Sequence, residues 1–211
     1  GLEGVVAAVK EGRTTFQRIL TYTLNSVTKK IVSGLLLAVG LLMTGHAVLT
    51  PLSMVIVLIT GDFLAMSLTT DNVRPSPMPN VWRIGSLTVA GTIMGTCLLV
   101  FCAAALAIGT YAMGLGTEQV RTLTFVAVVF GSQAMIYAIR ERRRLWSSRP
   151  SVWLIASSVA DIVIASVLAV AGLAMTPLPP VIVGATLAAA VVLALVLDLV
   201  KIPVLAYLRI A

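Results

Sequence analysis

The sequence predicts an all-α membrane protein with six transmembrane helices, an amphipathic helix before the first of them, and both termini in the cytoplasm. Of its 211 residues, 59% are hydrophobic and only 11% are charged, and the mean hydropathy is +1.04. This is the composition of an integral membrane protein. Six apolar stretches reach the roughly 20 residues that a helix needs to cross the hydrocarbon core. Their length and their Ala, Leu and Val content favour helices over the short alternating strands of a barrel.

The first 25 residues are expected to form a separate cytoplasmic element. Within residues 2–24 the apolar side chains fall near one helical stripe and most charges lie elsewhere. Two interpretations remain open: a helix that lies on the membrane surface, or a stalk that runs straight into the first span, since no proline interrupts residues 5–45. We therefore divide the chain into a stalk at 1–25 and a six-helix transmembrane domain at 26–211.

The membrane domain divides into spans that are separated by short polar connections. We expect these spans at 26–45, 51–70, 86–109, 122–140, 152–174 and 180–200. Pro51 suits the first turn of the second span. The three prolines of "TTDNVRPSPMPN" exclude helix and favour an extended connection to the third span. In the third span, Gly91 and Gly95 of "GTIMG" allow a neighbouring helix to approach closely.

Basic residues predict the orientation of the chain. All but Arg121 fall on one side of the six spans, which is a strong positive-inside pattern and places both termini in the cytoplasm. The net charge is +7, but no soluble basic face with interleaved aromatic residues is present, so we expect no nucleic-acid partner. The run "RERRRLWSSR" at 140–149 is explained by topology, and a further role in binding anionic lipid stays open.

Asp62 lies close to the midpoint of the second span. A carboxylate at that depth costs about 2.5 to 3.5 kcal/mol on insertion scales, so we expect it to face the interior of the bundle and to be functional. Gly61 and Thr60 beside it weaken the helix and make backbone carbonyls available to a cation. These residues predict an ion-binding site with Asp62 as its main ligand. The alternative is a structural aspartate bonded to a Ser or Thr of a neighbouring helix.

Three further acids are weaker candidates. Asp161 is nearly as deep in the fifth span, where Ser157 and Ser158 offer local hydrogen-bond partners, and structural and functional roles are equally open. Asp198 precedes Lys201 by three residues, which predicts an ion pair within one helix. Asp71 lies at the membrane edge, where we expect it to flank the proline-rich connection.

Several of these segments share motifs with one family of membrane proteins. The stretch "LITGDFLAMSLTTDNVRPSPMPNVWRIGSL" resembles the sixth transmembrane helix and following loop of P-type cation-transporting ATPases, specifically the plasma-membrane proton-pump branch. The matching positions are Asp62, Met66, Ser67, Asp71, Arg74, "PSPMP" and Trp82. The opening "GLEGVVAAVKEGRTTFQRILTYTL" is similar to the link from the phosphorylation domain into the fifth helix, through Arg13, Phe16, Arg18 and Tyr22. The end, "LVLDLVKIPVLAYLRI", is similar to the last helix of that family.

The resemblance implies that the chain is the carboxyl-terminal six-helix part of a translocase in the plasma membrane. It implies that Asp62 binds a proton or a small cation, and that Arg13, Phe16, Arg18 and Tyr22 couple the stalk to the membrane. Two positions depart from the family: Gly61 stands where plant-like pumps have Asn, and the family's basic residue of the fifth helix falls near Val32, with Lys30 only nearby.

The resemblance also implies partners outside these residues. The expected partners are the lipid bilayer and the missing amino-terminal and cytoplasmic domains, and ATP and Mg are expected for the parent pump. The 211 residues contain no Asp-Lys-Thr-Gly phosphorylation motif, so we expect no catalytic residue and no cofactor here, and no ATP hydrolysis by this part alone. The alternative function is a free-standing six-helix secondary carrier or a membrane scaffold.

Overall fold

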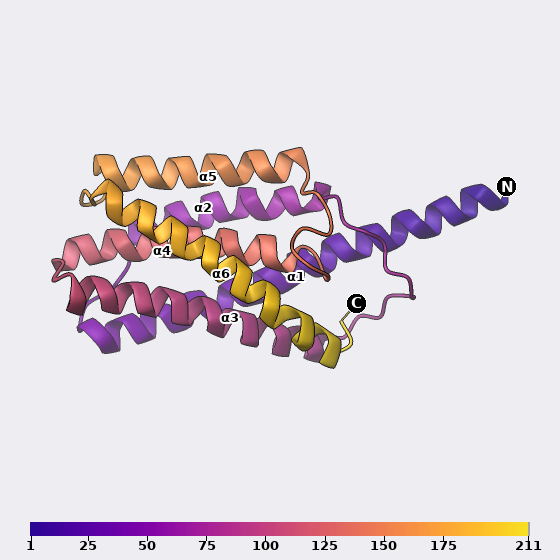
Figure 1. The fold of residues 1–211 in the computed structure, drawn as a ribbon, viewed down its shortest axis with the longest axis horizontal. Coiled ribbons are helices and arrows are strands. Elements are labelled where there is room, and N and C mark those ends of the chain that lie inside the picture. The colour runs from indigo at the N-terminus through magenta and orange to yellow at the C-terminus, as the bar shows by residue number, and fades with distance from the viewer. Residues whose placement is uncertain (211) are drawn as a thin grey trace.

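The computed structural model describes residues 1–210, and helices dominate it (Figure 1). Among these residues there is no strand, and six helices are long and apolar enough to cross a membrane, which confirms the all-α class and the number of spans. The elements are α1 (Leu2–Thr44), α2 (Pro51–Ser67) with a 3-10 turn η1 (Leu68–Thr70), α3 (Ile84–Ala107) with a π turn η2 (Ile108–Ala112), α4 (Thr117–Ile139), α5 (Val152–Ala171) and α6 (Pro180–Tyr207).

The amphipathic segment and the first span form one uninterrupted helix, α1. Its first ten residues are exposed, and Figure 1 shows this part projecting beyond the other helices. Of the two interpretations of residues 2–24, the structure therefore has the stalk that continues into the first span. Figure 1 also shows both termini toward the same end of the molecule, as an even number of spans requires.

Helix α4 forms the centre of the bundle. It packs against α1, α2, α3, α5 and α6, and most of its side chains are buried on all sides. Around it, α1 and α3 approach closely through small residues. The Thr28 hydroxyl donates a hydrogen bond to the Gly91 carbonyl at 3.3 Å, and a Cβ at position 91 would come within 2.9 Å of Val27. The close approach predicted from "GTIMG" is thus confirmed.

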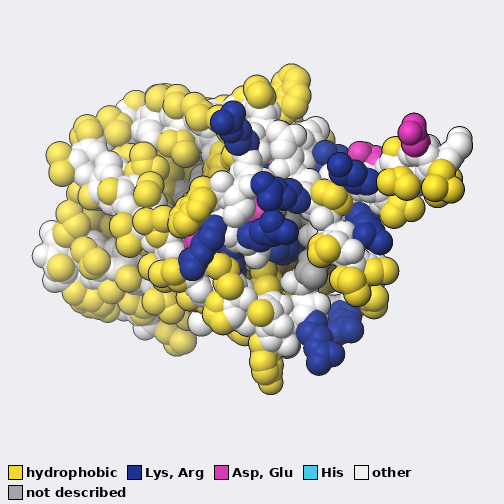
Figure 2. Space-filling view, turned by 45° about the vertical axis from the view of Figure 1, so that its right-hand side comes forward, with side chains coloured by type: hydrophobic (Ala, Val, Ile, Leu, Met, Phe, Trp, Pro, Cys, Tyr) yellow, Lys and Arg dark blue, Asp and Glu magenta, His cyan; other side chains and the backbone are white. Residues whose placement is uncertain are grey.

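Most expected spans agree with the helices, and the differences lie at helix ends. Helix α5 ends at Ala171 instead of residue 174 because Gly172 takes a left-handed conformation, with φ of 69°, and closes the helix. Helix α4 begins five residues earlier than expected, at Thr117. Helix α6 continues to Tyr207 although Pro203 lies inside it. Lys and Arg side chains gather toward the end from which α1 projects, and hydrophobic side chains cover the rest of the visible face (Figure 2).

Candidate ion site within the helix bundle

A small internal cavity lies where α1, α2, α4 and α5 meet within the apolar part of the bundle. Its volume is about 10 Å³, which is close to the minimum for one water molecule. It is lined by Lys29, Val57, Thr60, Gly61, Leu64, Val129, Ser132, Ile136 and Asp161. A lysine, an aspartate and two hydroxyl residues on the wall of a cavity between membrane helices are costly to insert, and such groups mark ion and proton pathways.

Asp161 is held at the cavity by a hydrogen-bonded chain from α4. Its side chain is 6% exposed, and Gln133 Nε2 donates to its Oδ2 at 2.5 Å. The Ser158 hydroxyl in turn donates to Gln133 Oε1 at 2.6 Å. Asp161 therefore has its partner on another helix, and the local serine acts through Gln133, which the sequence alone did not predict.

The second oxygen of Asp161, Oδ1, has no hydrogen-bond partner. The Thr60 side chain lies beside this carboxylate, but its hydroxyl donates to the Ile56 carbonyl at 2.9 Å. A buried carboxylate oxygen without a donor is unfavourable by roughly 1 to 3 kcal/mol or more. The open oxygen thus gives the cavity a free acceptor for a cation or a protonated group.

Lys29 brings a positive charge to the same cavity. It lies 15 residues before the end of α1 at Thr44, so it stands about 22 Å from that end at 1.5 Å per residue, within a hydrocarbon core about 30 Å thick. Lys29 interacts electrostatically with Asp62 and with Asp161. Gly61 packs directly against the Lys29 ammonium, because a Cβ at position 61 would overlap Nζ.

Sequence reasoning missed Lys29 by counting it with the cytoplasmic basic residues. The signal was available, since the resemblance places a basic residue near Val32 and Lys29 lies three residues earlier, nearly one turn away on the same helix face. Lys30, the neighbour named instead, is exposed. The basic residue that lines the cavity is therefore Lys29.

Asp62 does not face the interior of these six helices. Its side chain is exposed on the outside of these six helices, because successive residues of a helix turn by 100° and Gly61 occupies the inward position. Helix α2 is also unbroken through Thr60 and Gly61, so their backbone carbonyls are not free to bind a cation. Thr60 contributes its side chain to the cavity wall, and Gly61 leaves space for Lys29. Asp62 still attracts the Lys29 ammonium electrostatically from outside the cavity.

Three of the four stalk residues singled out from the sequence contact the α2–α3 connection, residues 71–83. Arg13 Nη1 donates to the carbonyls of Ser76 at 3.2 Å and Pro77 at 3.1 Å. Arg18 Nε donates to the Asp71 carbonyl at 2.8 Å. Phe16 packs edge-on against Trp82, with ring centroids 5.6 Å apart. The fourth residue, Tyr22, is 42% exposed.

Asp71 does more than flank that connection. Arg140, at the end of α4, donates to Asp71 Oδ2 through Nε at 2.7 Å and to Oδ1 through Nη2 at 3.1 Å. Both side chains are almost completely buried. The expected pair of Asp198 and Lys201 is also present, at 2.9 Å. The pair of Asp71 and Arg140 thus fixes the α2–α3 connection to α4. The Lys201 ammonium fixes the end of α6 to α4, because it donates to the Ala138 carbonyl at 2.5 Å.

The fold and its apolar helices define a multi-pass integral membrane protein. No family model matches the sequence. Over 179 residues, 84% of this chain, the sequence is 25% identical to a protein of Methanocaldococcus jannaschii that is provisionally named a cation-transporting ATPase. The chain spans about 22% of the length of that relative.

Proposed function

We propose that this chain is the membrane-embedded part of an ATP-driven P-type pump and carries part of the translocation site for a proton or a small cation. The observation that carries the proposal is the cavity between α1, α2, α4 and α5, which Lys29 and Asp161 line and where Asp62 attracts Lys29 from outside. The name of the Methanocaldococcus relative supports the same class. ATP and Mg²⁺ would act in the cytoplasmic domains of the whole protein, and the proposed location is the plasma membrane.

The charges of the site favour a single monovalent ion. One lysine stands against two aspartates, so the three side chains sum to a charge of −1 when all are ionised. A proton or one monovalent cation neutralises that charge, and the open Oδ1 of Asp161 offers it an acceptor. Asp62, which points away from these six helices, would face the remaining membrane helices of the pump.

The Lys29 ammonium competes with the cation for the same carboxylates. When it approaches them, the attraction for the cation falls and release is favoured; when it withdraws, the cation binds. Lys29 and the stalk belong to the same continuous helix, α1. A movement of the stalk driven by phosphorylation elsewhere in the protein would therefore change the position of Lys29. Arg13, Phe16 and Arg18 would pass part of that movement to the α2–α3 connection.

The test uses the full-length protein in sealed vesicles. We expect ATP-dependent uptake of one ion from a panel of H⁺, Na⁺, K⁺ and Ca²⁺, and we expect Asp62→Asn to abolish it. Glu118→Gln is the matched control, because Glu118 is an exposed acid in the first turn of α4, remote from the cavity. Uptake that proceeds without ATP would instead support the secondary carrier, and a reading frame without an upstream Asp-Lys-Thr-Gly motif would contradict the proposal.

A further inference from the structure

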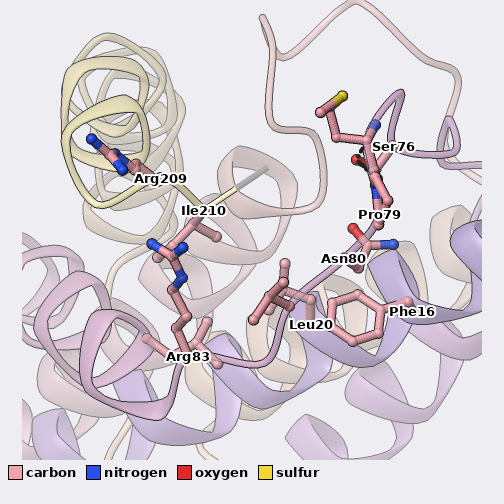
Figure 3. Close-up of a pocket in the computed structure, with 11 residues that line it drawn as sticks. Phe16, Leu20, Ser76, Pro79, Asn80, Arg83, Arg209 and Ile210 are labelled. Atoms are coloured by element: carbon pink, nitrogen blue, oxygen red, sulfur yellow. Dashed lines mark hydrogen bonds between the residues drawn. The ribbon is translucent and has the colours of Figure 1, made fainter.

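A second cavity, distinct from the ion site, lies at the end of the bundle from which the stalk projects. Its volume is about 350 Å³, within the range of small-molecule sites. Three parts of the chain enclose it: the stalk, the α2–α3 connection with the start of α3, and the residues that follow α6 (Figure 3). Its lining residues are Phe16, Leu20, Ser76, Met78, Pro79, Asn80, Val81, Arg83, Leu87, Arg209 and Ile210.

The charge of this cavity is positive. Arg83 and Arg209 lie on the same side of it, next to Ile210, and face Asn80 and Ser76 across it (Figure 3). Both arginines are exposed, and within residues 1–210 neither forms an ion pair with an acidic side chain. No acid lines the cavity. Two guanidinium groups without an acidic partner favour the binding of an anion. The planar guanidinium group donates paired hydrogen bonds to phosphate oxygens, so phosphate suits this site.

The floor of the cavity is apolar. Leu20 and Leu87 are buried there, at 4% and 3% exposure, and Phe16 and Ile210 complete the apolar wall. A small hydrated anion would not gain from contact with this apolar surface. A molecule with a phosphate and a hydrocarbon chain would contact both the arginines and the leucines.

The cavity also lies at the boundary of the membrane. Arg83 immediately precedes α3, a membrane-spanning helix, and Arg209 follows the end of another, α6. Aromatic and aliphatic side chains beside it, Trp82, Ile84 and Tyr207, are 43%, 67% and 87% exposed. Exposed Trp and Tyr at helix ends are typical of the membrane–water interface. The basic residues make this the cytoplasmic side, whose leaflet holds anionic lipids.

We infer that this cavity binds one anionic phospholipid of the cytoplasmic leaflet. Its phosphate lies between Arg83 and Arg209, and the first part of an acyl chain lies against Leu20 and Leu87. The cavity has room only for the headgroup and the first part of one acyl chain, so the rest of the acyl chains runs along the exposed faces of α3 and α6. This inference does not depend on the transport activity.

The experiment is native mass spectrometry of the purified full-length protein in detergent, titrated with phosphatidylglycerol or with phosphatidylcholine of the same acyl chains. The double variant Arg83→Gln/Arg209→Gln should bind phosphatidylglycerol about thirtyfold more weakly than wild type, which corresponds to roughly 2 kcal/mol for two basic side chains. Binding of phosphatidylcholine should not change. The single variant Arg209→Gln changes an exposed residue after the last helix, so it keeps the test decisive if the double variant is unstable; about a fivefold loss is expected.

The matched control is Lys10→Gln/Arg143→Gln, which removes the same charge from exposed positions outside the cavity. An equal loss in this control would overturn the inference, because the attraction would then come from the net charge alone. Unchanged affinity of Arg209→Gln would also overturn it. A third arm adds inorganic phosphate at millimolar concentration: competition as strong as that of the lipid would show a site for free phosphate and would contradict the lipid assignment.

Discussion

The contact between Gly61 and Lys29 makes a prediction with a defined sign. In Gly61→Ala the added methyl group overlaps the Lys29 ammonium, which must withdraw by about 1 Å or more from the cavity. Within residues 1–210, neither Asp62 nor Asp161 is within ion-pair distance of Lys29. Taking a charge separation of about 6 Å and an effective dielectric constant of about 20, this withdrawal weakens the attraction by roughly 0.4 kcal/mol for each carboxylate. For two carboxylates the sum is roughly 0.8 kcal/mol, or about fourfold in affinity. Because Lys29 competes with the cation, the half-saturating cation concentration of ATP-driven uptake should fall, and the maximal rate should fall as release slows.

The assay for this prediction is the initial rate of uptake into sealed vesicles as a function of cation concentration. Stability should not account for the effect, because Ala is better than Gly in a helix by about 1 kcal/mol. Gly184→Ala is the matched control, since a Cβ at position 184 of α6 meets no atom within 4 Å. If Gly61→Ala had the same half-saturating concentration as Gly184→Ala, or a higher one, the competition between Lys29 and the cation would be refuted.

Three further substitutions test the packing and the buried charges. Asp161→Asn should lower the ATP-driven uptake rate at least tenfold with little change in melting temperature, because the amide oxygen still accepts from Gln133 while the charge is lost; unchanged uptake would exclude Asp161 from the site. Asp71→Asn should lower the free energy of unfolding by about 3 to 5 kcal/mol, since it leaves the buried Arg140 unpaired, and a loss under 1 kcal/mol in denaturant unfolding would contradict this. Gly91→Val should destabilise the protein by about 1 to 3 kcal/mol through its overlap with α1, whereas thermal unfolding should show little change for Gly85→Val, where the space is open.

The helices could be predicted from the sequence because their signal is local. A membrane span is a run of apolar residues of fixed minimum length, and neither neighbours nor packing are needed to recognise it. The prolines of the α2–α3 connection and the pair of Asp198 and Lys201 are local in the same sense. The stalk was also predictable, as no helix-breaking residue separates it from the first span.

The site was predictable only in part because it depends on which way each helix faces. Depth alone singled out Asp62, but its rotation about the α2 axis places Gly61 inward and Asp62 outward. The positive-inside pattern accounts for nearly every basic residue by topology alone. It therefore gave no sign that two of these basic side chains lie inside the helix bundle. Lys29 enters the cavity, and Arg140 is 1% exposed and paired with Asp71. Side-chain pairs between helices that are far apart in the sequence produce no local sequence pattern, so they could not be predicted.

The most direct test of the ion site is the rate of ATP hydrolysis by the full-length protein as the transported cation is titrated. For the wild type we expect a saturable stimulation, because cation binding at Asp62 and Asp161, in competition with Lys29, is coupled to hydrolysis through α1. Asp62→Asn should show no stimulation at any cation concentration while still binding ATP. Stimulation of Asp62→Asn with the wild-type concentration dependence would contradict the assignment of the ion site to this part of the bundle.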